Sequence, residues 1–502
     1  MKKQSLWIDT SPPQDFPQLR GRVVVDVLIV GGGITGLTTA YLLKKAGCRV
    51  ALVDQQNIGG GETSHTTAHV TFVTDERLHK LASRLGQQEA QALWGAGRLA
   101  MEKIAEITGE LDVDCELRRV PGYLFAAFGK DLEKETESLK EDALLADAFG
   151  FDADFMKSDP LFNRPAVRFP NQLKFHPLKY VNAIAKALHG DGCHVFSKTS
   201  GSNLDSEKHE LHADGGVISY ERVVAATHVP IQGERDTFGA ALFQTKLAAY
   251  STYAIEAEIE SVAESLFWDT NDPYLYLRFD QREGGNSVII GGEDHKTGQD
   301  EDTEARYERL ERSLRKIFPD AKLKHRWSGQ VLETPDGLPY IGEVAERQFL
   351  ATGFSGNGMT LGTFSAILVR DLITGKSNPW TGLFAPDRKS VAGFLDYVRE
   401  NKDFLSYFVK DWLRPAEPLE SLRRGTGDVL KLGGKKRAVY CDEHGKRTVL
   451  SPICPHMGCI VAWNEAERTW DCPCHGSRFT ATGEVIAGPA ESNLEPKPVE
   501  ES

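Results

Sequence analysis

The stretch DVLIVGGGITGLTTAYLLKKAGCRVALVD, from Asp26 to Asp54, decides the fold of the N-terminal part of the chain. The apolar run Val27–Val30 predicts a buried strand. A helix to about Lys45 and a second strand that ends at Asp54 are expected to follow. Between the first strand and the helix stand glycines in the spacing G-x-G-x-x-G. They permit a tight turn, close approach to a pyrophosphate and close packing of helix on strand. Strand, glycine motif, helix, strand and acid in this order predict a dinucleotide-binding unit.

The bound dinucleotide is expected to contact the ends of these elements. Amide groups at the helix N-terminus would bind its phosphates, and Asp54 would bind the ribose hydroxyls. The motif alone does not distinguish FAD from NAD. The predicted contact residues in this segment are Gly31, Gly33, Ile34, Thr35, Gly36 and Asp54.

A second glycine-rich turn occurs in FLATGFSGNGMTLGTFSAILVRDLITG, residues 349–375. This segment predicts a strand, a glycine-rich loop and a helix from about Met359 to Ile373. The N-terminus of that helix could face a group that becomes negative on reduction, as the flavin N1–C2=O group does, which favours FAD. The predicted contact residues are Gly353, Gly356, Asn357, Gly358, Met359 and Thr360.

Together with GGGETSHTTAH (59–69), VIIGGEDHKTG (288–298) and TPDGLPYIG (334–342), these segments resemble the D-amino-acid oxidase-like FAD oxidoreductases, which include the glycine and sarcosine oxidases. The resemblance spans about residues 25–375. It implies an α/β (α+β) architecture, in which a Rossmann-type FAD-binding domain is interleaved with a mixed-sheet substrate domain. It also implies flavin contacts at Ser64, His65, Thr66 and Thr67. His65 falls where some relatives carry a histidine bonded covalently to the flavin; a noncovalent polar contact is the alternative.

The segment DPYLYLRF, residues 272–279, predicts a strand with Tyr274, Tyr276 and Arg278 on one face. In the family that this chain resembles, a tyrosine and an arginine grip the carboxylate of the substrate, and an arginine fork suits a carboxylate. Tyr276 and Arg278 are therefore the candidate catalytic residues. The alternative is a solvated strand face with half-buried tyrosines. His176, in FHPLKY, is either a further candidate or a helix cap.

Near the C-terminus, two short boxes combine cysteine and histidine: CPHMGC (454–459) and CPCHGS (472–477). Their C-x-H and C-x-x-H spacings would bring two thiolates and two imidazoles together. Such a set could bind tetrahedral zinc. It could also bind a [2Fe–2S] cluster, with cysteines on one iron and histidines on the other.

The two boxes resemble those of the Rieske iron–sulfur family almost residue for residue, and the resemblance covers roughly residues 415–502. It implies a small all-β domain in which Ser477 donates a hydrogen bond to the cluster. Phe479 stands where high-potential members have a tyrosine, so we expect a potential below the respiratory type. The implied iron ligands are Cys454 and Cys472 on one iron and His456 and His475 on the other, with a disulfide between Cys459 and Cys474.

Composition limits the partners and the location of the protein. With 59 Lys and Arg against 72 Asp and Glu, the net charge of −13 argues against nucleic acid or an anionic membrane. No apolar run has the length of a membrane-spanning helix, and no signal peptide is visible, so a cytoplasmic protein is expected. The predicted domains are residues 1–378 for the FAD-dependent part, 379–414 for a helical linker and 415–502 for the Rieske domain.

The function expected from these features is that of an FAD-dependent dehydrogenase with its own electron outlet. A small amine or amino acid would transfer a hydride to the flavin. The Rieske cluster, with its histidine ligands near the surface, would pass electrons singly to an external one-electron partner. Two alternatives remain open at this point. One is a reductase that takes electrons in through the cluster, and the other is a non-catalytic redox sensor.

Overall fold

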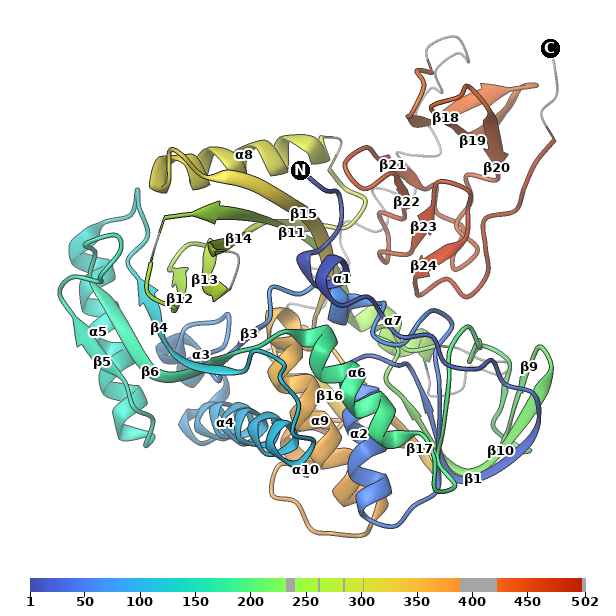
Figure 1. Ribbon diagram of the computed structural model, residues 1–502, viewed down its shortest axis with the longest axis horizontal. Coiled ribbons are helices and arrows are strands. Elements are labelled where there is room, and N and C mark those ends of the chain that lie inside the picture. The colour runs from blue at the N-terminus through green and yellow to red at the C-terminus, as the bar shows by residue number, and fades with distance from the viewer. Residues whose placement is uncertain (232–239, 261, 283–284, 301, 389–421, 499–502) are drawn as a thin grey trace.

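The computed structural model describes residues 1–231, 240–260, 262–282, 285–300, 302–388 and 422–498. Figure 1 shows two large sheets with their helices, formed by residues 1–388 (the N-terminal part), and a smaller unit formed by residues 422–498 (the C-terminal unit). Of the linker predicted at 379–414, the short helix α10 (Thr381–Phe384) is described. The remainder of that linker, from residue 389 onward, lies outside the described residues.

The first sheet forms around the predicted glycine motif. Strand β1 (Gly21–Val30) pairs in parallel with β2 (Val50–Val53) and with β10 (Gly216–Ala225). The strand order is β16-β17-β10-β1-β2-β7, and β9 and β8 extend the sheet beside β10. The remaining strands are β7 (His194–Phe196), β8 (Leu204–Asp205), β9 (Glu210–Ala213), β16 (Tyr340–Ala345) and β17 (Gln348–Thr352).

Helix α2 (Ile34–Lys45) packs against α6 (Pro177–Leu188) and α9 (Gly358–Ile373) beside this sheet. Helix α2 is buried almost along its whole length, and its close approach to β1 depends on glycine. A Cβ on Gly36 would lie 1.9 Å from the carbonyl oxygen of Gly31. The helices predicted after both glycine-rich turns are therefore confirmed.

The second sheet has the order β15-β11-β14-β13-β12-β4-β6-β3, with β5 beside β6. It is mixed, because β12 and β4 pair in parallel whereas the other neighbours pair antiparallel. Its strands are β3 (His69–Val70), β4 (Arg118–Phe125), β5 (Asp154–Met156), β6 (Ala166–Lys174), β11 (Ala248–Ile259), β12 (Leu266–Asp269), β13 (Tyr276–Arg282), β14 (Gly285–Lys296) and β15 (Lys322–Glu333).

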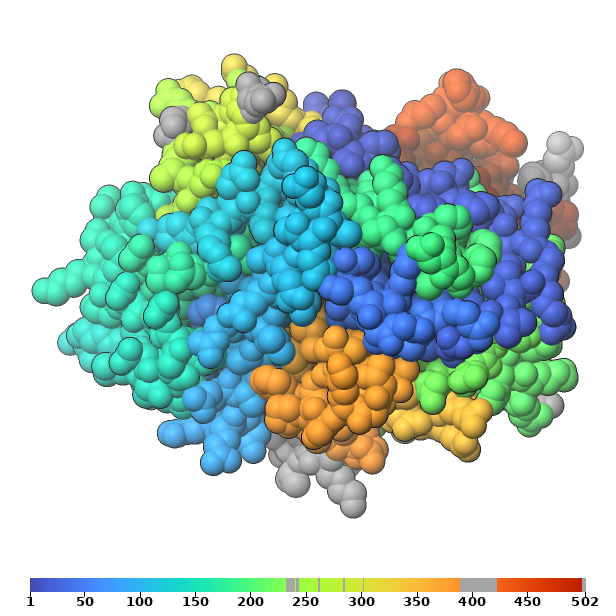
Figure 2. All heavy atoms as spheres, turned by 60° about the horizontal axis from the view of Figure 1, so that its bottom comes forward, coloured from blue at the N-terminus to red at the C-terminus, as the bar shows by residue number. Residues whose placement is uncertain are grey.

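The two sheets draw on alternating segments of the chain. Figure 2 shows blue, green and orange segments packed side by side on one face of the molecule, which is the interleaved arrangement expected from the sequence. Helix α8 (Thr303–Ile317) packs on β11 and β14, and α5 (Leu132–Ala148) packs on β5 and β6. The remaining helices are α1 (Leu6–Thr10), α3 (Leu78–Leu85), α4 (Gln87–Glu110), α7 (Ala240–Lys246), and the 3-10 turns η1 (Glu62–Ser64) and η4 (Ser355–Asn357).

The C-terminal unit consists of two small antiparallel sheets, β18-β19-β20 and β21-β22-β23-β24. In Figure 1 the four-stranded sheet lies nearer to the N-terminal part than the three-stranded sheet does. This small all-β unit agrees with the fold expected from the sequence. The strands are β18 (Gly427–Leu432), β19 (Lys435–Cys441), β20 (Arg447–Leu450), β21 (Ala462–Asn464), β22 (Thr469–Asp471), β23 (Arg478–Thr480) and β24 (Val485–Ala487).

None of the helices in the described part of the chain combines the length and the hydrophobicity that crossing a membrane requires.

Candidate functional site: a shared cavity and a cysteine–histidine centre

A cavity of about 950 Å³ lies between the two sheets and is lined by all the main parts of the molecule. The glycine turn after β1 and the first residues of α9 form one region of the wall. Strands β11, β13, β14 and β15 of the second sheet form another. The C-terminal unit contributes residues 486–491, so the wall of the cavity is shared between the two parts of the molecule.

The predicted nucleotide contacts divide into those that reach this cavity and those that support it. Gly36 packs beneath the turn, and the Thr360 hydroxyl donates to the carbonyl of Thr71 at 3.0 Å. Sequence spacing identified the motifs but did not show which members reach the cavity. Those that line it are Gly31, Gly33, Ile34, Thr35, Asp54, His65, Thr66, Thr67, Gly356, Asn357, Gly358 and Met359, whereas Gly36, Ser64, Gly353 and Thr360 do not.

The Asp54 carboxylate sits at the end of β2 beside the glycine turn. It accepts hydrogen bonds from the amides of Gly32, at 2.6 Å, and Gln56, at 2.7 Å. Burial raises the pKa of Asp54, although both amide bonds oppose that effect. The Ile34 amide, at the start of α2, donates to the Thr63 hydroxyl at 3.0 Å. These contacts hold an acid and a helix N-terminus on the same side of the cavity, as the dinucleotide motif requires.

His65 lies on the cavity wall at the end of η1. Its Nδ1 atom is 3.1 Å from the Gly61 carbonyl oxygen, and its own carbonyl accepts a hydrogen bond from Trp327 Nε1 at 2.8 Å. His176 does not line the cavity. It is the N-cap of α6, where its Nδ1 accepts from the Lys179 amide at 3.3 Å. Of the two interpretations of His176, the helix cap is therefore the one that the structure supports.

The two candidate catalytic residues occupy different environments. Tyr276 lines the cavity, and its hydroxyl lies 3.0 Å from the hydroxyl of Thr252. Arg278 is fully buried and does not line the cavity. Its guanidinium donates to both carboxylate oxygens of Asp280, at 3.0 to 3.1 Å. It also donates to the carbonyls of Thr67, Ala68 and Phe175, at 3.1, 3.0 and 2.9 Å. The carboxylate-gripping role expected of Arg278 is therefore not supported, because its donors bind and order the chain itself.

An acidic region of the cavity wall was not predicted from the sequence. Burial raises the pKa of Asp294 to about 6, and its carboxylate is hydrogen-bonded to Thr252. Asp75 accepts hydrogen bonds from the Tyr274 hydroxyl at 2.8 Å and from the Gly356 amide at 2.8 Å, and burial raises its pKa as well. Asp294 falls inside the segment VIIGGEDHKTG, but only burial inside a cavity distinguishes it from a surface acid.

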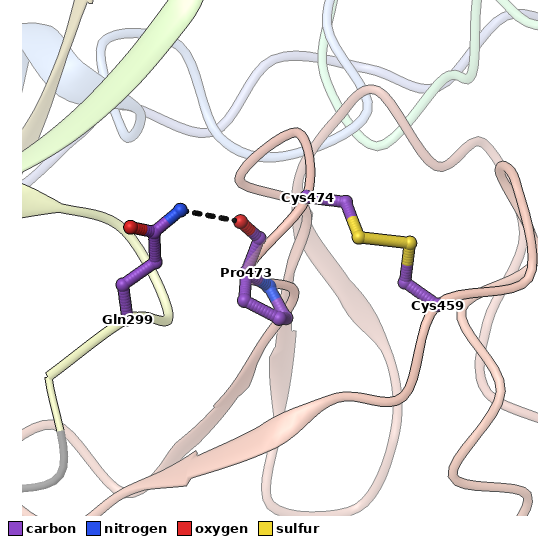
Figure 3. Close-up of a disulfide and its surroundings, with 4 residues drawn as sticks. All are labelled: Gln299, Cys459, Pro473 and Cys474. Atoms are coloured by element: carbon purple, nitrogen blue, oxygen red, sulfur yellow. Dashed lines mark hydrogen bonds between the residues drawn. A yellow bond between two sulfur atoms is a disulfide. The ribbon is translucent and has the colours of Figure 1, made fainter. Parts of the chain in front are cut away.

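The cysteine–histidine boxes form two loops with the same local geometry. The Gly458 amide donates to the Cys454 carbonyl, and the Gly476 amide donates to the Cys472 carbonyl, each at 3.0 Å. Both glycines have positive φ angles, of 80° and 76°. Cys459 and Cys474, one from each loop, form a disulfide (Figure 3). The two loops are thereby held together, as the resemblance implied.

The four remaining donors converge between these loops. The Cys454 and Cys472 thiols are each 1% exposed and hydrogen-bonded to one another, and the rings of His456 and His475 have their centroids 4.9 Å apart. The Ser477 hydroxyl is hydrogen-bonded to the Cys454 thiol, and it accepts a hydrogen bond from the Ala490 amide at 3.0 Å. Two paired thiols beside two paired imidazoles fit the donor set of a Rieske cluster.

Comparison with known proteins agrees with this description. The family described as "FAD dependent oxidoreductase" matches residues 26–372, and the family described as "Rieske [2Fe-2S] domain" matches residues 413–498. The putative Rieske 2Fe-2S iron-sulfur protein YhfW of Bacillus subtilis (strain 168) is 31% identical over 500 residues. That alignment covers 97% of this chain and 96% of YhfW.

More distant relatives match the N-terminal part. Gamma-glutamylputrescine oxidoreductase of Escherichia coli (strain K12) is 24% identical over 381 residues, which is 72% of this chain and 86% of that protein. The crystal structure of glycine oxidase from Geobacillus kaustophilus has the same fold, with a TM-score of 0.57 at 22% identity, over 73% of this chain and 99% of that one. The chain therefore belongs to the FAD-dependent oxidoreductase family and carries a Rieske [2Fe–2S] domain at its C-terminal end.

Proposed function

We propose that this protein oxidises a small amine or amino acid at FAD and passes the electrons singly through its Rieske cluster to an external one-electron acceptor. The observation that carries the proposal is the composition of the cavity wall. The dinucleotide turn after β1 and residues 486–491 of the C-terminal unit line one cavity. Two redox centres must lie close together to exchange electrons, and a cavity wall shared by the two parts of the molecule supports such an arrangement.

The residues that would hold FAD lie at two helix N-termini. The glycine turn and the first amides of α2 suit the pyrophosphate, and Asp54 suits the ribose hydroxyls. Residues 355–359, at the start of α9, suit the flavin carbonyl that gains negative charge on reduction. Bound there, FAD supplies the acceptor for a hydride from the substrate carbon.

The residues that would hold the cluster are the two free thiols and two imidazoles of the loops. Cys454 and Cys472 would bind one iron, and His456 and His475 the other. Histidine ligands bring less negative charge to the cluster than thiolates do. A hydrogen bond from the Ser477 hydroxyl, beside Cys454, would withdraw further negative charge from the cluster. Both effects raise the potential of the cluster, which favours electron flow out of the cavity.

Within this substrate class, we expect an amine, because the cavity wall offers a buried carboxylate and neither arginine of the site is left to bind a substrate carboxylate. The donors of Arg278 are engaged, and Arg77, on the cavity wall, is paired with Asp142 and Glu135. Asp294 Oδ1 is shielded from solvent and has no hydrogen-bond partner among the described residues. An ionised Asp294 would pair with the ammonium group of a substrate. The ammonium group would pass one proton to the Asp294 carboxylate, and hydride loss from the adjacent carbon of the neutral amine would give a protonated imine, which water hydrolyses.

The test is anaerobic. Oxidised protein is mixed with a panel of small amines and amino acids, and the visible spectrum is recorded. One amine is expected to bleach the flavin band first and the cluster bands afterwards. If no compound does so while dithionite bleaches both, the substrate assignment is wrong. A reductase that takes electrons in through the cluster, or a redox sensor, then explains the two cofactors better.

A variant tests the electron outlet separately. With His475→Ala, the substrate should still bleach the flavin, but an external one-electron acceptor should no longer be reduced. Reduction of that acceptor at the normal rate would show that electrons do not leave through the cluster. The two midpoint potentials give the direction of flow, since a cluster potential well above that of the flavin favours flow outward.

A further inference from the structure

The edge of the C-terminal unit that carries His456 and His475 faces the N-terminal part. Gln299, from the loop after β14, donates its Nε2 hydrogen to the Pro473 carbonyl at 3.0 Å (Figure 3). A Cβ on Gly298 would lie 2.8 Å from the nitrogen of Pro473, so the two backbones are in close contact. From the sequence, these histidines are expected near the surface, ready for an external partner. Both are half-buried, and the surface that they occupy is the contact between the two parts of the chain.

One hydrogen-bonded bridge joins the cavity wall to His456. Gln244, on α7, is 2% exposed, and its Nε2 donates to the carbonyl of the cavity-lining Pro230 at 2.7 Å. That bond fixes the orientation of the amide, so Oε1 faces His456 Nε2, 2.9 Å away. Because Oε1 can only accept, His456 Nε2 carries the hydrogen. The ring nitrogen left for iron is Nδ1.

A second bridge joins the cavity wall to the loop of His475. Gln330, on β15, lines the cavity and is 3% exposed. Its Nε2 donates to the carbonyl of Gly476 at 2.9 Å, and Gly476 directly follows His475. The backbone amide of Gln330 is held in turn by Glu62 Oε2, at 2.7 Å. Each histidine loop is therefore connected to the cavity wall through a buried glutamine.

We infer that Gln244 and Gln330 are positioning residues that hold the histidine edge of the cluster against the cavity, and that this edge is where electrons enter the cluster. The direction of flow rests on the proposed function, whereas the route does not. Each passage moves one electron. Two passages discharge the electron pair that a hydride delivers, and the external one-electron acceptor empties the cluster between them.

The bridge at His456 has an electronic consequence. An acceptor on the outer nitrogen of a metal-binding imidazole raises the basicity of the ligand, which stabilises the oxidised metal. Removal of the Gln244 acceptor should therefore shift the cluster potential upward. Gln330 binds a backbone carbonyl rather than an iron ligand, so its removal should leave the potential unchanged.

A contact elsewhere in the interface supplies the control. The Thr303 hydroxyl donates to Asn464 Oδ1 at 2.8 Å, and the Tyr307 hydroxyl donates to Glu467 Oε1 at 2.7 Å. Both contacts involve the turn between β21 and β22 rather than the histidine loops. Thr303→Val removes this hydrogen bond and the one that the Ala466 amide donates to the same hydroxyl at 3.2 Å, and it leaves both glutamine bridges in place.

The experiment compares the full-length holoprotein with Gln244→Leu, Gln330→Leu and Thr303→Val. The bound flavin is reduced anaerobically by light with EDTA as electron donor, so no substrate is needed, and the appearance of the reduced cluster is followed. The electron paramagnetic resonance spectrum and the midpoint potential of each dithionite-reduced protein are recorded separately. Both glutamine variants should slow cluster reduction at least tenfold. Gln244→Leu alone should change the spectrum and raise the potential, and Thr303→Val should leave all three measurements unchanged.

Wild-type rates in both glutamine variants would overturn the inference, and so would equal slowing by Thr303→Val. If Gln244→Leu does not take up the cluster, the rate in Gln330→Leu decides the outcome. A wild-type protein in which reduced flavin never reduces the cluster would overturn both this inference and the proposed outlet. Failure of every amine in the substrate panel would leave the light-driven result intact, and would therefore count against the substrate assignment alone.

Discussion

Replacement of Gly476 by alanine is the sharpest test of how the two parts of the molecule meet. Gly476 has a φ angle of 76°, and an added Cβ would lie 2.4 Å from the Ala249 Cβ and 3.0 Å from Gln330 Nε2. Gly458 is its counterpart in the other loop. Its φ angle is 80°, and an added Cβ would meet nothing within 4 Å. The two substitutions share the backbone strain and differ only in the contact.

The expected magnitude follows from that difference. Alanine at a positive φ angle costs about 1–2 kcal/mol, which applies to both variants. Carbon atoms pack at about 3.5–4.0 Å, so a separation of 2.4 Å forces the Gly476 loop away from Ala249 by about 1 Å or more. Overpacking of this kind costs about 1–3 kcal/mol. The docked arrangement should therefore weaken by roughly 5- to 150-fold in Gly476→Ala and much less in Gly458→Ala.

Hydrogen exchange measures this change directly. The Ala466 amide, in the C-terminal unit, donates to the Thr303 hydroxyl in the N-terminal part at 3.2 Å, so its exchange reports separation of the two parts. Gly476→Ala should accelerate exchange of the peptide that contains Ala466. The additional change Ala249→Gly should restore slow exchange, because it removes the opposing methyl group. Equal acceleration by Gly458→Ala, or no recovery in the double variant, would refute the argument.

Three further predictions concern the cavity and the cluster loops. Burial raises the pKa of Asp294 to about 6, so the affinity for a cationic amine should fall as the pH drops through that value. In Asp294→Asn this pH dependence should be lost and KM should rise roughly tenfold or more. Measurement of KM as a function of pH tests both expectations. Gly36→Ala should abolish FAD binding, because its Cβ would lie 1.9 Å from a carbonyl oxygen of the turn; flavin content after purification measures this, and Gly109→Ala, with nothing within 4 Å, is the control. Cys459→Ser removes a disulfide with a sequence separation of 15, worth about 3 kcal/mol, so the cluster bands should bleach at a lower temperature, whereas Cys441→Ser, at a buried free cysteine, should leave that temperature almost unchanged.

The elements that could be read from the sequence are those with local causes. The glycine spacing predicted β1, α2 and β2 because the turn, the helix start and the next strand lie within a few residues of one another. The two cysteine–histidine boxes were recognisable for the same reason, since each loop closes on itself through a backbone hydrogen bond from glycine to cysteine. Residue types at short spacing carry this information.

The candidate catalytic residues show where such reasoning fails. Strand alternation correctly placed Tyr276 and Arg278 on the same face of β13, but it could not show that Tyr276 lines the cavity whereas the Arg278 side chain is fully buried away from it. The partners of Arg278 include the carbonyls of Thr67 and Ala68, more than 200 positions earlier in the chain. Asp294 carries no local signal at all, because its raised pKa comes from the walls that bury it.

By itself, the sequence determined the two cofactor-binding units and their families, because each unit is encoded by contiguous motifs. Only the tertiary structure decided how the units face one another. His456 meets Gln244 across a sequence separation of 212, and Gly476 meets Gln330 across 146. Glutamine is a common residue with no motif of its own. Its role at these two positions follows from burial and from a fixed amide orientation, which exist only once the chain has folded.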